Sequence, residues 1–162
     1  MFPPLLLRLA ELVLADARAQ KLKIVTAESC TGGLLSAILT EIPGSSDVFD
    51  RGLVTYSNTA KRDLLGVPGD LLADYGAVSE PVVRAMAEGA LSHSKGDVSV
   101  AITGVAGPGG GTPLKPVGQV HFAAMRRGRS IVHEVHRFGD VGRSHVRLLS
   151  VEAALRLLHA QI

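Results

Sequence analysis

Residues 23–33 (KIVTAESCTGG) place a hydroxyl and a thiol in a predicted turn between a strand and a helix. Ser29 is expected at the carboxyl end of the strand, where a sharp strand-to-helix turn exposes a nucleophile. The amides of Thr31, Gly32 and Gly33 are expected to be free, because the first turn of a helix leaves its N–H groups unpaired. They could hold a phosphate or a developing oxyanion. The segment therefore fits a hydrolase elbow, an anion-binding turn, or a plain glycine-rich turn capped by a serine.

Further polar residues fall where two other strands are expected to end. Tyr56-Ser57-Asn58, with Lys61 close behind, ends one of these strands, and Thr103-Gly104 ends the other. In open α/β sheets, ligands bind at the carboxyl ends of the parallel strands. We therefore expect both clusters to meet the Ser29 turn at one edge of the sheet.

None of these clusters contains a histidine, so a serine nucleophile there needs another base. A lysine such as Lys61 can accept the proton if burial brings its pKa towards neutrality, and Tyr56 could relay a proton or orient either partner. The alternatives are a solvated lysine and a surface tyrosine. Cys30, at the start of a helix, is either an activated thiol or a small buried packing residue.

The hydrophobic pattern predicts alternating strands and helices, with a hairpin near the end. The expected helices are about 4–19, 31–40, 58–66 with Asn58 as its N-cap, 79–93, and 143–160 with Leu149 among its core residues. The expected strands are 23–27, 51–57, 97–103, 117–125 and 130–137. This order predicts an α/β fold, a three-layer α/β/α sandwich on a mixed sheet, formed by one domain over residues 1–162.

A loop rich in glycine and proline, 104–116, follows the third predicted strand. Loops of this length are often functional, and the bare backbone of its glycines can approach a ligand closely. The alternative is a flexible connection with no function of its own. The loop lacks the Gly-Lys-Ser/Thr ending of a P-loop, and no Gly-x-Gly-x-x-Gly follows the first strand. His133 and His136 lie three apart on a strand and so point to opposite faces, which argues against a zinc site.

The composition narrows the classes of partner. Hydrophobic residues make up 46% of the 162 residues and mean hydropathy is +0.27, which suits a sheet covered on both faces or a surface hidden in an oligomer. Aromatic residues make up 4% and the net charge is +2, so we expect no nucleic-acid partner. The single cysteine, Cys30, excludes an internal disulfide and a Cys-rich zinc site and favours a cytoplasmic location. The N-terminal apolar run reads as an amphipathic helix, so we expect no signal peptide and no membrane partner.

Taken together, several blocks resemble the CinA C-terminal-domain family over roughly residues 5 to 160. The blocks are TAESCTGG at 26–33, GLVTYSN at 52–58 with Lys61, YGAVSE at 75–80, TGVAGPGG at 103–110 and KPVG at 115–118. The resemblance implies a mixed, mostly parallel five-stranded sheet with one antiparallel strand. It also implies an assembly of two or more copies of the chain.

The same resemblance implies an activity: hydrolysis of the carboxamide of nicotinamide mononucleotide, a pyridine nucleotide, to nicotinic acid mononucleotide and ammonia, with no metal and no cofactor. Ser29 would be the nucleophile, Lys61 the base and Tyr56 the third member of the site. The expected substrate contacts are Glu28, Asn58, Thr103, Gly104, Ala106, Gly107 and Arg143.

One string departs from the family pattern. The family tends to show Gly-Asp-Arg with a second arginine four residues later; here Gly142 stands in place of the aspartate, before Arg143 and Arg147. The same domain also occurs fused within CinA proteins, so the alternative function is a non-catalytic nucleotide-binding or protein-interaction module related to competence and DNA repair. A third possibility keeps the enzyme and changes the substrate to another pyridine nucleotide or amide.

Overall fold

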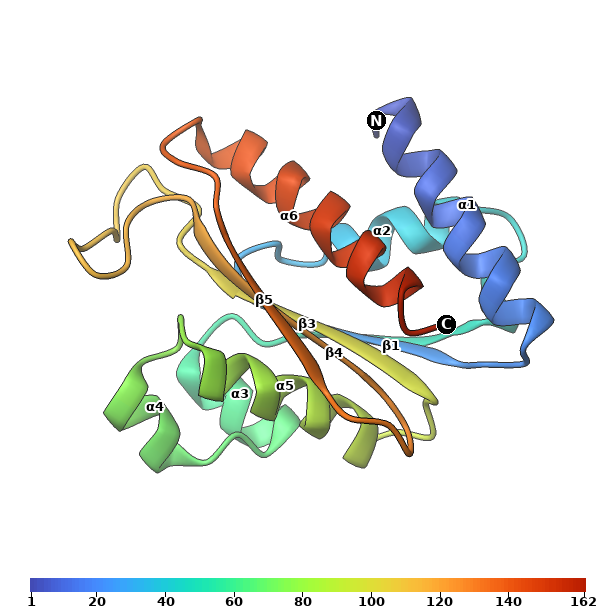
Figure 1. Cartoon of the computed structure of the whole chain (residues 1–162), viewed down its shortest axis with the longest axis horizontal. Coiled ribbons are helices and arrows are strands. Elements are labelled where there is room, and N and C mark those ends of the chain that lie inside the picture. The colour runs from blue at the N-terminus through green and yellow to red at the C-terminus, as the bar shows by residue number, and fades with distance from the viewer.

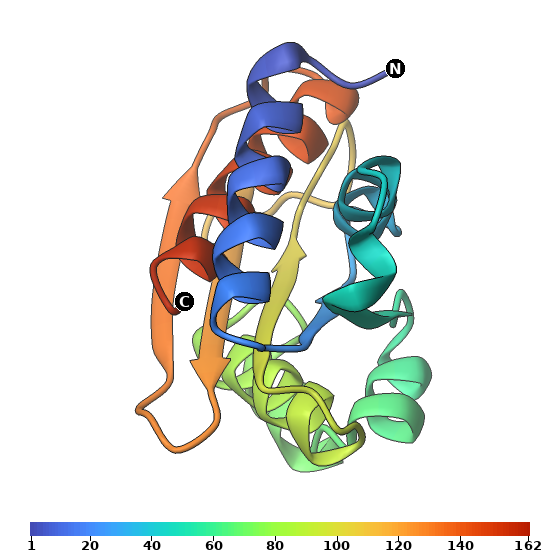
Figure 2. The same cartoon turned by 90° about the vertical axis from the view of Figure 1, so that its right-hand side faces the viewer.

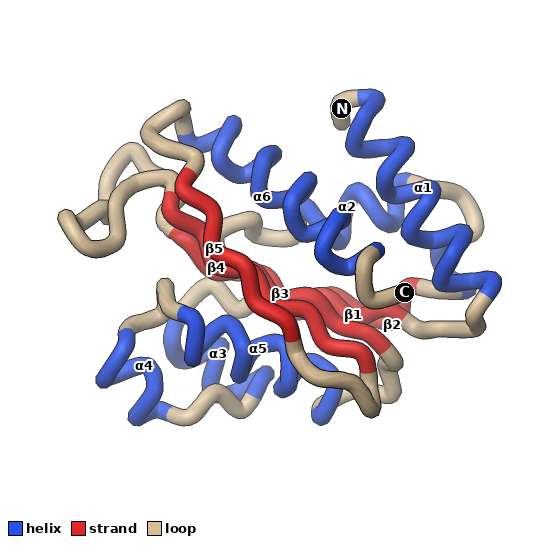
Figure 3. The backbone as a smooth tube through the Cα atoms, viewed as in Figure 1, coloured by secondary structure: helices blue, strands red, loops and turns tan.

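The computed structural model describes all 162 residues. One sheet lies between two layers of helices (Figure 3). The strands are β1 (Ile24–Glu28), β2 (Phe49–Val54), β3 (Val98–Gly104), β4 (Gln119–Arg126) and β5 (Val132–Arg137). The helices are α1 (Pro4–Ala19), α2 (Leu34–Glu41), α3 (Asn58–Leu65), α4 (Gly69–Tyr75), α5 (Glu80–Ser92) and α6 (Arg143–His159), with a 3₁₀ turn at Ser45–Asp47.

The strand order is β2-β1-β3-β4-β5. β1 pairs in parallel with β2 and β3, whereas β4 is antiparallel to β3 and β5 is antiparallel to β4, so β4 alone runs against the other four. Helices α1, α2 and α6 cover one face of the sheet, and α3, α4 and α5 cover the other (Figure 1). The predicted three-layer α/β/α sandwich on a mixed, mostly parallel sheet is confirmed.

Strands β1 and β3 are buried on both faces, and the mostly apolar sequence of β3 is typical of such a strand. In β3, Val100 and Ile102 pack under α1 and α6, and Ala101 between them packs under α5. Figure 2 shows α1 lying beside α6 on the first of these faces. The two faces together enclose β1 and β3, so the ends of these strands are held rigidly where the site is expected.

Several expected boundaries are corrected by backbone geometry. The second helix begins at Leu34 and not at residue 31, because Gly32 and Gly33 have φ of +56° and +101° and keep the turn out of the helix. Asn58 is not the N-cap of α3. The hydroxyl of Ser57 accepts a hydrogen bond from the Ala60 amide at 3.0 Å, which makes Ser57 the cap.

Two other features differ from expectation. Helix α4 was not predicted, because it is short and begins at Pro68-Gly69, a pair typical of loops. Leu149 is half-buried on the outer side of α6, while Val146 and Ser150 face inward. None of the helices combines the length and the apolar character that a membrane crossing requires.

Candidate active site

A cavity of about 300 Å³ opens where β1 and β3 end. Figure 1 shows the loop between β3 and β4 projecting at this end of the sheet. Of the residues expected at the site, the cavity is lined by Ser29, Tyr56, Lys61, Thr103, Gly104, Ala106, Gly107 and Arg143. Its wall is completed by Cys30, Ala77, Val78, Val105, Gly109 and Gly110. The carboxyl edge of the parallel strands thus brings together segments that lie far apart in the sequence.

Ser29 and Lys61 are in direct contact within this cavity. The Ser29 amide donates to the Ile102 carbonyl at 3.0 Å, which ties the turn after β1 to β3. Lys61, on α3, places its Nζ 2.9 Å from Ser29 Oγ. This spacing is within the reach required between a nucleophile and its base.

The surroundings of Lys61 favour its neutral form. The side chain is only 1% exposed, and no carboxylate lies within ion-pair distance of it. Burial therefore lowers the pKa of Lys61 from 10.5 to about 8. Its Nζ donates to the carbonyl oxygens of Thr55 at 2.8 Å and Tyr56 at 3.3 Å. In a neutral amine these two acceptors engage both N–H groups, so the lone pair is left facing the Ser29 hydroxyl.

Cys30 differs sharply from its neighbour. It is buried, and burial raises the pKa of the Cys30 thiol to about 11, against the smaller opposing effects of Arg147 and Lys61. A thiol is reactive as the thiolate. At neutral pH the Cys30 side chain is therefore a protonated packing group, while Ser29 has the base.

Tyr56 contributes to the site through two different atoms. Its carbonyl oxygen accepts from Lys61, but its side chain is 60% exposed and its hydroxyl accepts from Arg143 Nη2 at 3.0 Å. No hydrogen bond joins that hydroxyl to Ser29 or Lys61. Arg143 Nη1 also donates to the Gly107 carbonyl at 2.7 Å, so one guanidinium bridges Tyr56 and the glycine-rich loop. Arg143 thus reaches the cavity, with Gly142 before it in the sequence.

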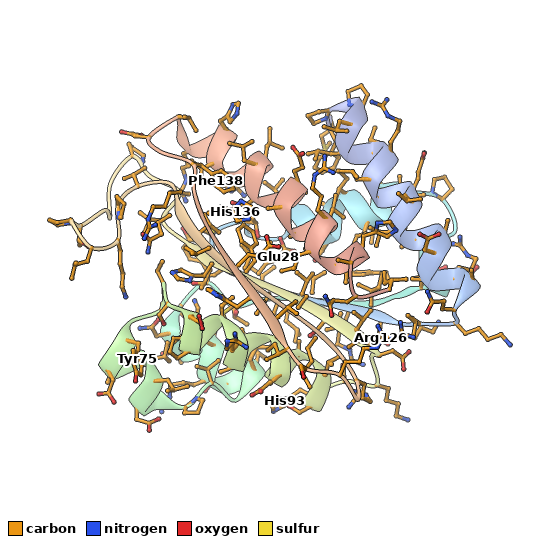
Figure 4. The ribbon with its side chains drawn as sticks, viewed as in Figure 1. Glu28, Tyr75, His93, Arg126, His136 and Phe138 are labelled. Atoms are coloured by element: carbon orange, nitrogen blue, oxygen red, sulfur yellow. The ribbon has the colours of Figure 1, made fainter.

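Glu28 lies outside the cavity wall, near the centre of the molecule (Figure 4). It is fully buried, and its oxygens accept four hydrogen bonds, from Thr31 Oγ1, the Leu35 amide, and both the amide and the hydroxyl of Ser36. The expected substrate contact is corrected: its acceptors are already used to hold the start of α2. Asn58, another expected contact, is exposed and does not line the cavity.

The expected oxyanion amides also need correction. The Gly32 amide donates to the Ser29 carbonyl at 3.0 Å, so it is not free. Thr31, Gly32 and Gly33 do not line the cavity, whereas Cys30 does. The amides of Cys30 and Thr31 donate to no other residue of the protein. The Gly33 amide is also unpaired, as expected, but of these unpaired amides only that of Cys30 belongs to a residue that lines the cavity.

The glycine-rich loop presents unpaired amides to the cavity. Ala106, Gly107, Gly109 and Gly110 all line it, and none of their N–H groups donates a hydrogen bond within the protein. Gly107 has φ of +82°, and a Cβ there would come within 2.6 Å of Val117. A side chain is therefore excluded at Gly107, and the bare backbone faces the cavity. Such a concave set of amides is suited to an anion.

The segment with Ala77 and Val78 was not assigned to the site from sequence, although it lies inside the YGAVSE block. The hydroxyl of Thr103 donates to the Ala77 carbonyl at 3.0 Å and holds this segment against β3. Ala77 and Val78 are thus two of the apolar residues that line the cavity. No group of three or more His, Cys, Asp or Glu side chains is arranged to bind a metal ion.

Comparisons with known proteins agree with this architecture. A "CinA-like protein" of Akkermansia muciniphila is 50% identical over 153 residues, which cover 94% of this chain and 37% of that protein. The crystal structure of the competence/damage inducible protein CihA from Agrobacterium tumefaciens is 49% identical, with a TM-score of 0.97 over 99% of this chain and 97% of that one. A competence damage-inducible protein A from Klebsiella pneumoniae is 35% identical, with a TM-score of 0.91 over 96% of each chain.

The chain spans about a third of the length of the curated relatives that it matches. It also matches the family described as the CinA C-terminal domain over residues 6–162, nearly its whole length. The chain therefore belongs to the CinA C-terminal domain family.

Proposed function

We propose that this protein is a serine amidohydrolase that deamidates nicotinamide mononucleotide to nicotinic acid mononucleotide and ammonia. The observation that carries the proposal is the Ser29–Lys61 pair: a buried lysine with a lowered pKa lies 2.9 Å from a serine hydroxyl in a cavity. A module that only binds has no need of a desolvated base beside a hydroxyl. Its burial costs stability, and such a cost is typical of functional sites.

The chemistry follows from these positions. Ser29 Oγ attacks the carboxamide carbon while its proton moves to Lys61 Nζ, and the carbonyl electron pair moves onto the oxygen. When the tetrahedral intermediate collapses, Lys61 returns the proton to the amide nitrogen and ammonia leaves. Water then attacks the acyl-enzyme, again through Lys61, and releases the carboxylic acid and free Ser29. At a pKa of about 8, about one Lys61 in ten is neutral at neutral pH, against about one in a thousand for a free lysine.

The other end of the cavity supports binding of the phosphate. The unpaired amides of the glycine-rich loop and the guanidinium of Arg143 face the same space. Backbone N–H groups and arginine are both strong phosphate partners. Arg143 is the side chain through which the loop and Tyr56 would close around a phosphate, because it already contacts both.

The test is ammonia release from nicotinamide mononucleotide by the purified protein. We expect activity in the parent and its loss in Ser29→Ala, with Ser46→Ala as the matched control, because Ser46 is exposed and remote from the cavity. The pyridine product is identified by NMR. A parent that releases no ammonia would favour the non-catalytic module, and equal activity in parent and Ser29→Ala would remove the serine from the mechanism.

A further inference from the structure

The turn that carries Ser29 is held from α6 by one side chain, Arg147. Its Nε donates to the Cys30 carbonyl at 3.1 Å, and its Nη2 donates to the Thr31 carbonyl at 3.0 Å. The guanidinium packs directly on the turn, since a Cβ placed on Gly32 would lie 3.3 Å from Nη2. Arg147 does not line the cavity.

The carboxylate of Glu28 holds the same turn by accepting hydrogen bonds from it. It accepts from the Thr31 hydroxyl at 2.7 Å and from the Leu35 amide at 2.9 Å. Arg147 therefore fixes backbone carbonyls, and Glu28 fixes the following helix start. The conformation of the turn is determined by two buried or half-buried charged groups that approach it from different elements.

The direction of the carbonyls determines the direction of the amides. In a planar trans peptide the C=O and the N–H of one unit point in opposite directions. Because the Cys30 carbonyl points at Arg147, the Thr31 N–H points away from it. The Ser29 carbonyl accepts from Gly32, so the Cys30 N–H points away from the interior of the turn. Neither N–H donates to another residue of the protein.

We propose that the amide of Cys30, which lines the cavity, is an oxyanion donor beside Ser29 and that Arg147 is the positioning residue that orients it. Arg147 holds the Thr31 carbonyl, the Gly32 amide of the same peptide unit holds the Ser29 carbonyl, and that carbonyl sets the direction of the Cys30 N–H. This inference rests on the proposed amide hydrolysis. Arg147 acts on the reaction only through the two carbonyls, without touching the substrate. The developing negative charge meets an N–H group that is already aligned, which is the condition for strong stabilisation of a transition state.

A purely structural role for Arg147 would have a different signature. A residue that only attached α6 to the turn would alter unfolding and would change activity in proportion to the folded fraction. A residue that aligns oxyanion donors alters the chemical step in the fully folded protein. It lowers kcat and leaves KM nearly unchanged, since the Cys30 amide acts mainly in the transition state.

The experiment compares Arg147→Met, which keeps the length of the stem, with Arg147→Lys, which keeps the charge. Arg156→Met, an exposed arginine elsewhere on α6, is the control, because its only hydrogen-bond and ion-pair partner is Glu152. Two quantities are measured: kcat and KM for ammonia release, and the rate at which a fluorophosphonate labels Ser29. The probe needs no knowledge of the substrate, and its phosphoryl oxygen takes the oxyanion position.

We expect Arg147→Met to lower both kcat and the labelling rate by about 10- to 100-fold, less than or equal to the loss of an oxyanion donor itself. Arg147→Lys should recover part of this loss, and Arg156→Met should match the parent. Parental values in Arg147→Met, or a loss confined to KM, would overturn the inference. If Arg147→Met does not fold, Arg147→Lys takes its place: one ammonium cannot hold both carbonyls as the guanidinium does, so kcat and the labelling rate should still fall, and parental values in Arg147→Lys would then overturn the inference.

The two proposals can fail separately. A parent that is labelled by the fluorophosphonate but releases no ammonia from the nucleotide would refute the proposed substrate, and the labelling rates would still test Arg147. A parent that is active while Arg147→Met equals it would refute only the positioning role. A parent that is neither active nor labelled would refute both.

Discussion

Replacing Lys61 by methionine should change the pH dependence of folding in a defined way. The buried amine has a pKa of about 8 in the native state against 10.5 ordinarily, and burial is the largest cause of this shift. Between these values the unfolded chain holds a proton that the native state has lost. Stability of the parent therefore rises with pH through this window, whereas Lys61→Met lacks this contribution.

The size of the effect follows from the shift. Two and a half pKa units correspond to about 3 kcal/mol of native-state penalty at pH values below about 8. Between about pH 7 and 9.5, about 2 kcal/mol of this penalty should disappear from the parent. The substitution also removes the hydrogen bonds to the Thr55 and Tyr56 carbonyls. The loss of these hydrogen bonds is nearly the same at every pH. It therefore changes the size of the difference in free energy of unfolding between parent and Lys61→Met, but not how that difference varies with pH.

The assay is urea unfolding of parent and Lys61→Met at a series of pH values, with Lys95→Met as control, because Lys95 is exposed and forms no ion pair. We expect the free energy of unfolding of the parent, relative to Lys61→Met, to rise by about 2 kcal/mol across this range, and Lys95→Met to run parallel to the parent. Parallel curves for parent and Lys61→Met would refute the lowered pKa.

Three kinetic predictions accompany it. Ser29→Ala should lose several orders of magnitude in turnover, as loss of a covalent nucleophile does elsewhere. Cys30→Ala should stay within about tenfold of the parent, because the Cys30 thiol is protonated. If Cys30→Ala were the inactive variant and Ser29→Ala the active one, the nucleophile would be Cys30. The kcat/KM of the parent should rise with pH to a plateau above about 8. Lys61→Arg should be nearly inactive, since guanidinium keeps its proton. An active arginine variant would mean that Lys61 contributes only a positive charge and is not the base. Arg143→Ala should weaken hydrolysis of the mononucleotide but barely that of nicotinamide riboside, and equal efficiency of the parent with both compounds would remove the phosphate from this end of the cavity.

The position of the site could be predicted because it depends on topology. Once β1 and β3 are parallel, their carboxyl ends must share an edge, and Ser29 and Thr103 must lie near each other. Lys61 could be placed there as well, because it lies in the first turn of α3, the helix that follows the neighbouring strand β2. The contact between Ser29 and Lys61 is therefore a consequence of element order and needs no detailed geometry to foresee.

The corrected details depend on single dihedral angles and side-chain directions. Glu28 could have been placed correctly by alternation, since neighbours in a strand point to opposite faces and Glu28 faces α2 while Ser29 faces α3. By contrast, the hydrogen bond from the Gly32 amide to the Ser29 carbonyl closes a turn whose path depends on the dihedral angles of Cys30 and Thr31. Nothing in the sequence indicates that Arg147, more than a hundred positions away, turns the Cys30 carbonyl towards α6.

The most direct test of the central claim is a search for the acyl-enzyme. Excess protein is mixed with nicotinamide mononucleotide, quenched in acid during the first turnover, digested and analysed by mass spectrometry. Our account predicts an adduct equal to the substrate minus ammonia on the Ser29 hydroxyl, absent in Ser29→Ala. An adduct on Cys30, or full conversion of the nucleotide with no adduct at any time point, would contradict it.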